Sequence, residues 1–152
     1  MKFIGLTMVV ALAACGTDDT VAQFAGTWMP APGAALTLSC SNGNTITSLV
    51  TSAEAYAKGV DADLASTSSF SSGSCTIRYD VNGKTATARV GQSCTSMSNG
   101  LTIVITIQTA TLTLGSDSKM MTESVSGTAV VSGSASGTCT VGATYTLNKV
   151  SN

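Results

Sequence analysis

Acidic side chains and cysteines are the residues of this 152-residue chain whose types could support chemistry, because the chain contains no histidine. The commonest general base is therefore missing, and no serine lies in a nucleophile-elbow or S-x-x-K motif. Paired carboxylates could still hydrolyse glycosidic bonds. The acidic candidates are Glu54, Asp61, Asp63, Asp80, Asp117 and Glu123. These acids are few, so the sequence predicts a protein that is not an enzyme and has no catalytic residues.

A calcium site is the one metal site that the acids suggest. Asp61 and Asp63 would lie on one face of a strand and could bind calcium together with Asp80. Calcium takes six to eight oxygen ligands, and the D-x-D-x-D-G order of a dedicated loop is absent. A solvated loop or edge strand is the favoured interpretation. We therefore expect no metal and no other cofactor.

Four cysteines follow Cys15, and their spacing favours disulfides over zinc. They are Cys40, Cys75, Cys94 and Cys139, and none of them forms a C-x-x-C pair. An even number of cysteines in an exported chain indicates disulfide bonds. A bend at Gly91 could fold Cys94 back toward Cys75, so we favour Cys75–Cys94 and Cys40–Cys139, while the other two connectivities stay open.

The N-terminus has the profile of a secretory signal. Lys2 is followed by a run of twelve uncharged residues, 3–14, which is too short to span a bilayer. The run ends in Leu12-Ala13-Ala14-Cys15, which resembles the lipobox of bacterial lipoproteins. In that family the cysteine becomes the lipidated first residue of the mature protein. An ordinary signal peptide with a chance cysteine is the alternative.

The lipobox resemblance implies a domain organisation and a location. Residues 1–14 would be the signal peptide, 15–23 the lipidated Cys15 and a polar tether, and 24–152 a single β domain. In the lipoprotein family an aspartate after the cysteine retains the protein in the inner membrane, and this chain has Gly16 there. We therefore expect a protein held by its acyl chains in the outer membrane, with the leaflet left open.

The body of the chain is rich in serine, threonine and valine, with glycine and asparagine clusters between apolar runs, which is typical of β structure. We predict an all-β fold, an antiparallel β-sandwich or β-barrel of about 8–10 strands with two disulfides. Asn42-Gly43 and Asn82-Gly83 are expected as two-residue hairpin turns. These turns would pair Cys40 with Thr45 and Tyr79 with Ala86.

Other segments give further expectations. Residues 68–74 are predicted as a flexible loop, and residues 52–58 as a strand, with one or two helical turns as the alternative. In 101–114 the apolar residues change from odd to even positions, which requires a bulge or bend near Gln108. The last strand places its apolar residues on one face: Cys139, Val141, Ala143, Tyr145 and Leu147.

Gly26-Thr27-Trp28 resembles the G-x-W element that opens the first strand of lipocalins. In that family the tryptophan closes one end of an eight-stranded cup that holds small apolar ligands. A late arginine packs against the tryptophan, and Lys149 would take its place here. The family's T-D-Y segment is not found. A tryptophan that covers the core of any β-sandwich is the alternative interpretation.

Charge and aromatic content exclude several classes of partner. The formal net charge is only −1, so no basic surface for nucleic acid is expected. Arg78, Lys84 and Arg89 could form a small basic patch, but solubility is the favoured role. The aromatic residues do not suggest a stacking platform for sugars, because Tyr79 and Tyr145 are expected to face inward.

The sequence supports two hypotheses for function. The first is a non-catalytic structural or interaction module of the cell envelope, with an unknown protein partner. The alternative is a lipocalin-like carrier of a small apolar ligand. A carrier predicts a continuous apolar cavity, whereas an interaction module predicts a filled core and an exposed patch or edge.

Overall fold

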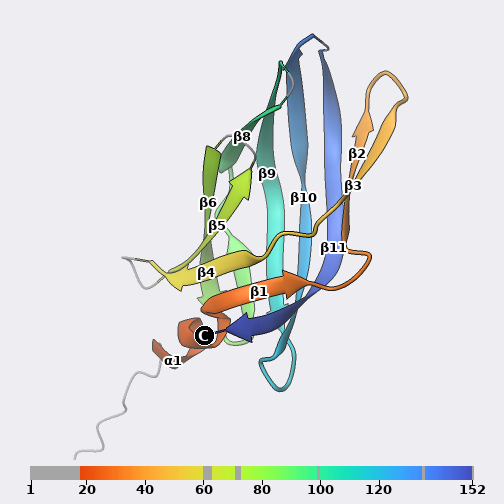
Figure 1. The fold of residues 1–152 in the computed structure, drawn as a ribbon. Coiled ribbons are helices and arrows are strands. Elements are labelled where there is room, and N and C mark those ends of the chain that lie inside the picture. The colour runs from red at the N-terminus through yellow and green to blue at the C-terminus, as the bar shows by residue number, and fades with distance from the viewer. Residues whose placement is uncertain (1–17, 60–62, 71–72, 99, 135, 152) are drawn as a thin grey trace, which may run out of the picture.

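The computed structural model describes residues 18–59, 63–70, 73–98, 100–134 and 136–151. In these residues the chain forms one short helix and eleven strands, which confirms the predicted all-β class (Figure 1). The helix is α1 (Asp18–Phe24), and the strands are β1 (Gly26–Pro30), β2 (Ala35–Cys40), β3 (Thr45–Leu49), β4 (Glu54–Lys58), β5 (Leu64–Phe70), β6 (Gly73–Asn82), β7 (Thr85–Ala88), β8 (Ser93–Ser98), β9 (Leu101–Leu114), β10 (Met120–Gly133) and β11 (Gly137–Ser151). The strand predicted over 52–58 is therefore present as β4, and the helical alternative is excluded.

Eight of the strands close an antiparallel barrel in the order β1-β4-β5-β6-β7-β9-β10-β11. Strand β1 completes the circle because it pairs with β4 on one side and with β11 on the other. Trp28, for example, lies opposite both Glu54 and Lys149. Of the two architectures left open by the sequence, the structure is the barrel. Closure satisfies the backbone groups that an open sheet would leave free at its edges.

The barrel wall continues upward on one side only. Strands β9, β10 and β11 have 14, 14 and 15 residues and run past the barrel, as the long strands of Figure 1 show. Beyond the barrel, residues 139–143 of β11 pair with β2, which in turn pairs with β3. Residues 101–106 of β9 pair with β8. Strands β1 and β4 cross only the lower front of the molecule, so the upper front has no closing strand.

The lower end of the barrel is closed by packed side chains. Trp28 and Phe24 have no exposed surface, and the Trp28 indole nitrogen donates a hydrogen bond of 2.8 Å to the Phe24 carbonyl oxygen. Lys149 Nζ lies 5.4 Å from the centre of the Trp28 ring and donates to the Gln23 carbonyl oxygen at 3.1 Å. This lysine therefore combines a cation–π contact with a bond to the carboxyl end of α1.

Helix α1 differs from the polar tether predicted for 15–23. Val21 is 3% exposed and packs in the same core as Phe24, so residues 18–23 belong to the folded domain. The apolar pair one turn apart gives this short segment a face to bury. Residues 15–17 lie outside the described residues.

A bulge lies at Gln108, as predicted. Strand β10 pairs Ser126 with Thr109 and Gly127 with Ile107, so Gln108 has no partner across the ladder. The extra residue turns the two halves of β9 so that Ile107 and Ala110 are both buried. The alternation within each half therefore faces the interior.

The register predicted for both hairpins is wrong. In the first hairpin Ser39 lies opposite Thr45, because three residues, 41–43, form the loop and Gly43 takes the positive φ of 84°. In the second hairpin Tyr79 lies opposite Ala88, because Gly83-Lys84 is the two-residue loop, with Gly83 at φ 57°. That shift of two residues leaves the inward face unchanged. The shift of one residue in the first hairpin changes which side chains of the two strands share a face.

The flexible loop predicted for 68–74 is also wrong for most of its length. Strand β5 continues to Phe70, and β6 begins at Gly73, with these two residues paired. Cross-strand pairing with β6 outweighs the loop-like composition of this serine-rich segment.

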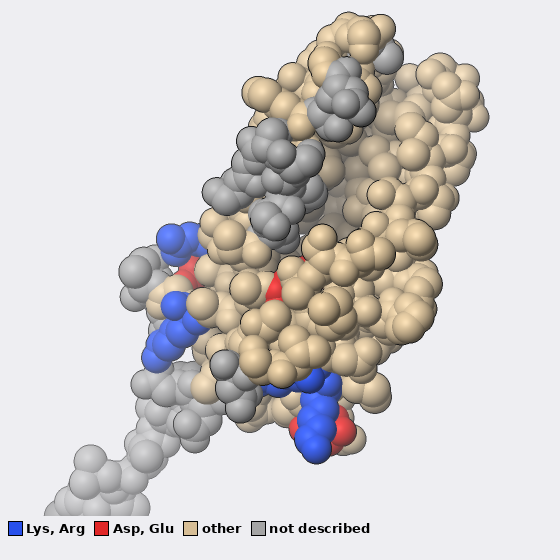
Figure 2. Space-filling view, in the orientation of Figure 1, with Lys and Arg blue, Asp and Glu red and all other residues tan. Residues whose placement is uncertain are grey.

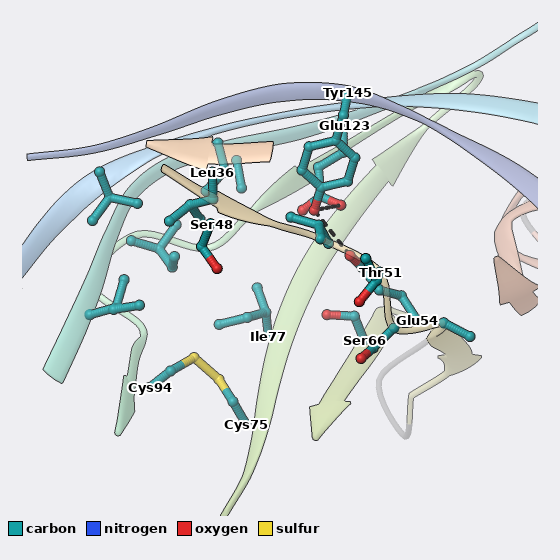
Figure 3. A pocket seen from close by; sticks show the side chains of 18 of the residues that line it. Leu36, Ser48, Thr51, Glu54, Ser66, Cys75, Ile77, Cys94, Glu123 and Tyr145 are labelled. Carbon is teal, nitrogen blue, oxygen red and sulfur yellow. Dashed lines mark hydrogen bonds between the residues drawn. A yellow bond between two sulfur atoms is a disulfide. The ribbon is translucent and has the colours of Figure 1, made fainter. Parts of the chain in front are cut away.

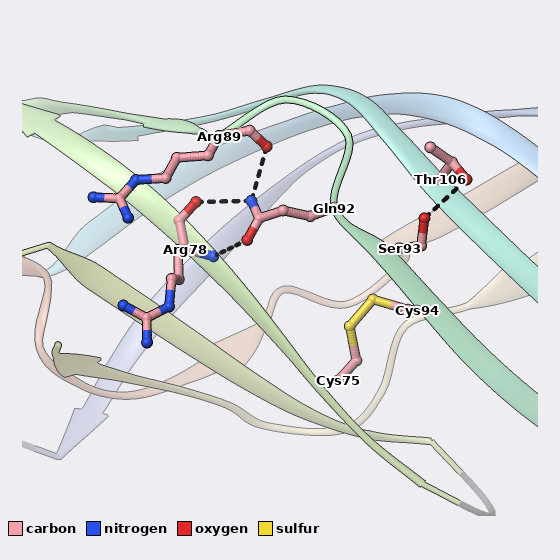
Figure 4. Close-up of a disulfide and its surroundings, with 7 residues drawn as sticks. All are labelled: Cys75, Arg78, Arg89, Gln92, Ser93, Cys94 and Thr106. Atoms are coloured by element: carbon pink, nitrogen blue, oxygen red, sulfur yellow. Dashed lines mark hydrogen bonds between the residues drawn. A yellow bond between two sulfur atoms is a disulfide. The ribbon is translucent and has the colours of Figure 1, made fainter. Parts of the chain in front are cut away.

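Two disulfides join the chain with the favoured connectivity, Cys75–Cys94 and Cys40–Cys139. Cys40 and Cys139 are register partners on β2 and β11. Cys75 and Cys94 connect β6 to β8 past the end of β7, where no ladder joins these strands (Figure 4). This second bridge therefore closes a part of the wall that lacks backbone pairing.

The Gln92 side chain replaces a missing strand beside the Cys75–Cys94 bridge. Its Oε1 accepts the Arg78 backbone N–H at 2.8 Å, and its Nε2 donates to the carbonyl oxygens of Arg78 and Arg89 at 2.9 and 2.8 Å (Figure 4). One side-chain amide thus bonds to three backbone groups just past the end of β7, where the Arg78 carbonyl also accepts the Arg89 backbone N–H at 3.0 Å.

We expect the Cys40–Cys139 bridge to stabilise the fold more than the Cys75–Cys94 bridge. The two bridges span 99 and 19 residues. Chain-entropy arguments assign about 4–5 kcal/mol to the longer loop and about 3 kcal/mol to the shorter one. Guanidinium unfolding of C40S/C139S and C75S/C94S, each against the parent protein, measures both values. If the free energy of unfolding falls by an equal or larger amount in C75S/C94S than in C40S/C139S, this order is contradicted.

We expect Q92A to lower the free energy of unfolding by about 1–3 kcal/mol, because it removes three hydrogen bonds to part-buried backbone groups. Q108A provides the matched control, since Gln108 is exposed at the bulge, and it should change stability by less than about 0.5 kcal/mol. Urea unfolding of both variants makes the comparison. Equal effects of the two substitutions would show that the Gln92 bonds contribute nothing.

Candidate functional site

A cavity of about 350 Å³ lies inside the barrel, above the closed end. Figure 2 shows the surface hollowed in the upper half of the molecule, with acidic surface at the foot of the hollow. The apolar wall of the cavity comes from five different strands. The aliphatic residues of this wall are Leu36, Ile77, Ile105, Ile107, Val125 and Val141. The segment 48–53 between β3 and β4 borders the cavity where no strand closes the upper front.

The floor of the cavity carries two buried carboxyl groups, Glu54 of β4 and Glu123 of β10, which we call the acidic pair. Their residues are only 9% and 7% exposed, and both face the interior of the barrel (Figure 3). Glu54 lies opposite Trp28 in the sheet, and Glu123 lies opposite Tyr145. Trp28 and Phe24 close the lower end of the barrel, and we call them the tryptophan plug. The acidic pair lies beside this plug, at the end of the apolar cavity.

Two tyrosine hydroxyls join the acidic pair. Tyr56 Oη donates to Glu54 Oε2 at 2.7 Å and lies 3.2 Å from Glu123 Oε2. Tyr145 Oη lies 3.0 Å from Glu54 Oε1 and 3.1 Å from Glu123 Oε2 (Figure 3). Each hydroxyl has one proton to donate, so the two tyrosines cannot supply protons to all four contacts. The two tyrosine protons serve two of the four contacts, and a proton on a carboxyl group can serve a third.

Glu123 is the carboxyl that holds this proton. Burial raises the pKa of Glu123 to about 8, with a further contribution from the negative charge of Glu54, while the hydrogen bonds from Tyr145 and Tyr56 act in the opposite direction. At neutral pH Glu123 therefore holds a proton. A protonated Glu123 can donate to a tyrosine oxygen and so supply a proton to a third of the four contacts.

The three tyrosines around the acidic pair stay neutral. Burial, followed by the charges of the acidic pair, raises the pKa of Tyr56, and the same causes raise the pKa of Tyr145. Tyr79 is 2% exposed, and its pKa is raised by burial and then by Glu123. Its ring lies 6.2 Å from that of Tyr56. The site thus presents neutral hydroxyl groups around the acidic pair.

This arrangement can do two kinds of chemistry. A buried negative charge with neutral neighbours attracts a positively charged group that enters from the cavity. Two carboxyls that hold a single proton between them can also act as an acid and a base. The aliphatic wall above the acidic pair suits an apolar molecule. It provides few polar groups to orient the many hydroxyls of a sugar.

The acids singled out from the sequence are divided between the interior and the surface. Asp63 binds Arg78 at 3.0 Å and Arg89 at 3.3 Å, and Asp80 binds Arg89 at 2.9 Å. Asp117 accepts the Lys119 backbone N–H within its turn. Asp61 lies outside the described residues, as does Cys15. Among the residues that the structure describes, no cluster of three or more metal-ligating side chains is found.

The structure does not bring together the small basic patch that was the less favoured interpretation of Arg78, Lys84 and Arg89. Arg78 and Arg89 face the carboxylates of Asp63 and Asp80 near one end of the hairpin. Lys84 lies at the other end and donates to the carbonyl oxygens of Gly115 and Ser116 at 3.4 and 3.2 Å. The cations of this hairpin therefore fix neighbouring segments instead of forming one surface.

Sequence reasoning named Glu54 and Glu123 as acids but did not pair them. The signal was available, because Glu123 falls between Met121 and Val125 on the face of β10 that is apolar elsewhere. A charged residue at an inward position of a strand is uncommon and points to a function. The inward orientation of Tyr145, which was predicted, places its hydroxyl on the acidic pair.

Comparison with known proteins found no matching family model, no similar curated protein and no similar solved structure. In the part of the chain that the structure describes, no helix is long and apolar enough to cross a bilayer. The function must therefore be argued from the barrel and its cavity.

Glu123 should make the protein less stable as pH rises. Its pKa is about 8 in the folded state, against an ordinary value of 4.5, so the folded protein holds a proton that the unfolded chain releases between these values. The contribution of Glu123 to the free energy of unfolding is fully present below pH 4.5 and is lost as pH rises through 8. The loss from this group should be on the order of 4 kcal/mol between pH 4.5 and 9.

Thermal unfolding from pH 5 to 9 of the parent protein, E123Q and D117N measures this effect. E123Q has no proton to lose there and should show a flatter profile, whereas D117N alters an exposed turn residue and should follow the parent protein. Parallel profiles for E123Q and the parent protein would exclude Glu123 as the titrating group.

Proposed function

We propose that this protein is a carrier that binds a small apolar ligand inside its barrel. The observation that carries the proposal is the cavity of about 350 Å³ lined by aliphatic side chains from several strands. Small-molecule sites have volumes of about 300–1000 Å³ and are lined mainly by apolar groups with a few placed polar ones. The acidic pair and its tyrosines supply those polar groups.

The cavity favours the carrier over the interaction module, which was the first hypothesis from the sequence. An interaction module predicts a filled core, yet Ile105, Val125 and Leu36 remain half-buried beside open space. Strand β3 does present a free edge with Ile46 and Leu49 exposed, and this edge is what a protein partner would use. No feature of that edge specifies a partner, so the cavity is the stronger basis for a function.

We also propose that the carrier acts without catalysis. Glu54 and Glu123 are each engaged by both tyrosines, which hold them as fixed hydrogen-bond partners. Besides aliphatic groups, the described lining residues add hydroxyls such as those of Ser48, Thr51 and Ser66, with no further carboxylate, lysine or arginine beside them to act as acid or base. A binding role needs only the apolar wall and the polar floor.

The lipobox resemblance at Cys15 supports a location for the carrier. We propose that the acyl chains of Cys15 hold it in the bacterial outer membrane, with α1 of the folded domain beginning at Asp18 and the barrel at Gly26. A ligand that is poorly soluble in water would then be bound next to the bilayer. The acyl chains need no contact with the barrel for this role.

The proposal is tested with N-phenyl-1-naphthylamine, an apolar dye that fluoresces in apolar surroundings, and a matched pair of variants in β10. V125F places a larger ring in the cavity, whereas V130F alters a valine that is 51% exposed on the same strand. We expect the dye to bind the parent protein, and V125F to weaken binding by about tenfold or more through steric exclusion. V130F should bind like the parent protein.

Circular dichroism of each variant confirms that it is folded before binding is compared. Failure of the dye to bind the parent protein would overturn the carrier proposal. Unchanged binding by folded V125F would place the dye outside the cavity, with the same consequence.

A further inference from the structure

We propose that the cavity selects a cationic amphiphile, in which an apolar chain or ring occupies the barrel and a protonated amine lies against Glu54 and Glu123. This inference rests on the proposed carrier function and adds the chemical class of the ligand. Its basis is the geometry of the cavity, where the aliphatic wall ends on the acidic pair. The ligand must therefore have one apolar end and one end that suits a buried negative charge.

Charge is what distinguishes the possible head groups. The acidic pair lies at the foot of the cavity with both residues more than nine-tenths buried, so solvent screens its charge weakly. No lysine or arginine is found among the described residues that line the cavity. A carboxylate or phosphate head would meet like charge at this depth. An ammonium head would supply the missing opposite charge.

Hydrogen bonding leads to the same class. Both oxygens of Glu54 and Oε2 of Glu123 contact a tyrosine hydroxyl, which can turn its proton from one partner to another. An ammonium group has donors only and can bond to both carboxyls at once. An alcohol head has a single donor and no charge, so it gains less at the same position.

The groups that face the acidic pair come from three strands. Tyr56 lies beside Glu54 on β4, Tyr145 on β11 contacts both carboxyls, and Tyr79 on β6 lies next to Tyr56. The nearest described cation toward the closed end, Lys149, is bonded to the Gln23 carbonyl beneath the tryptophan plug. The tyrosines stay neutral, so the charge that a ligand meets is set by the acidic pair.

A matched ligand series on the purified protein tests the inference. Isothermal titration calorimetry with decylamine, 1-decanol and decanoate, each below its micelle concentration, compares three heads on one chain. We expect decylamine to bind about tenfold or more tightly than 1-decanol, and decanoate to bind most weakly. Binding of 1-decanol or decanoate equal to or tighter than that of decylamine would overturn the inference while leaving the carrier function intact. Binding of none of the three would count against the carrier function itself.

Variants show whether the acidic pair is responsible. E54Q keeps the size of the side chain and removes its charge, so the preference for decylamine over 1-decanol should fall to about twofold or less, with 1-decanol binding retained. D80N removes the same charge from an exposed residue on the outer face, 70% exposed at its side chain, and should keep the full preference. A folded E54Q that keeps the preference would overturn the inference.

A measurement on the parent protein decides the case if E54Q does not fold. The preference for decylamine over 1-decanol should increase about threefold or more between pH 6.5 and 9, because Glu123 loses its proton in this range while an alkylammonium, like lysine, stays charged. A preference that does not change with pH would separate the head group from Glu123 and overturn the inference.

Discussion

The pairing of β1 with both β4 and β11 is the interaction on which the rest of the structure depends. It joins the two ends of the sheet into a barrel, and it fixes Trp28 between Glu54 and Lys149 at the lower end. Because only five residues of β1 do this, closure is confined to the lower third of the long strands. The same short strand therefore determines both that the barrel has a closed end and that its upper front lies open.

The cavity follows from closure at one end and from the size of the side chains above it. Around Trp28 the inward positions carry Phe24, Leu112, Met121 and Leu147, which fill the interior completely. Higher in the barrel the lining includes small residues such as Ser66, Ala110 and Val125, and a cavity remains between the side chains. The Cys75–Cys94 bridge and the Gln92 bonds hold this less densely packed part of the wall together, where the ladder between β6 and β8 is missing.

Sequence patterns predicted local features of this molecule better than the relations between distant strands. The bulge at Gln108 and the inward face of β11 follow from alternation, which is a property of one strand. Disulfide pairing could be favoured because a hairpin and one bend brought Cys94 toward Cys75. The registers of the hairpins were wrong, because an Asn-Gly pair fits loops of two or three residues and in different positions. The acidic pair was missed because Glu54 and Glu123 are 69 residues apart, and only closure of the barrel brings them together.

The proton held by the acidic pair explains how the barrel tolerates two carboxyls in its interior. Two buried negative charges at this distance would repel each other and would have no cation among the described lining residues to offset them. Protonation of Glu123 removes one of the charges and supplies the donor that the tyrosine network lacks. A cation bound to the acidic pair would serve the same purpose, so a proton and a cationic head group compete for one position. The feature that stabilises the unliganded protein is therefore the feature that makes its affinity for a cation depend on pH.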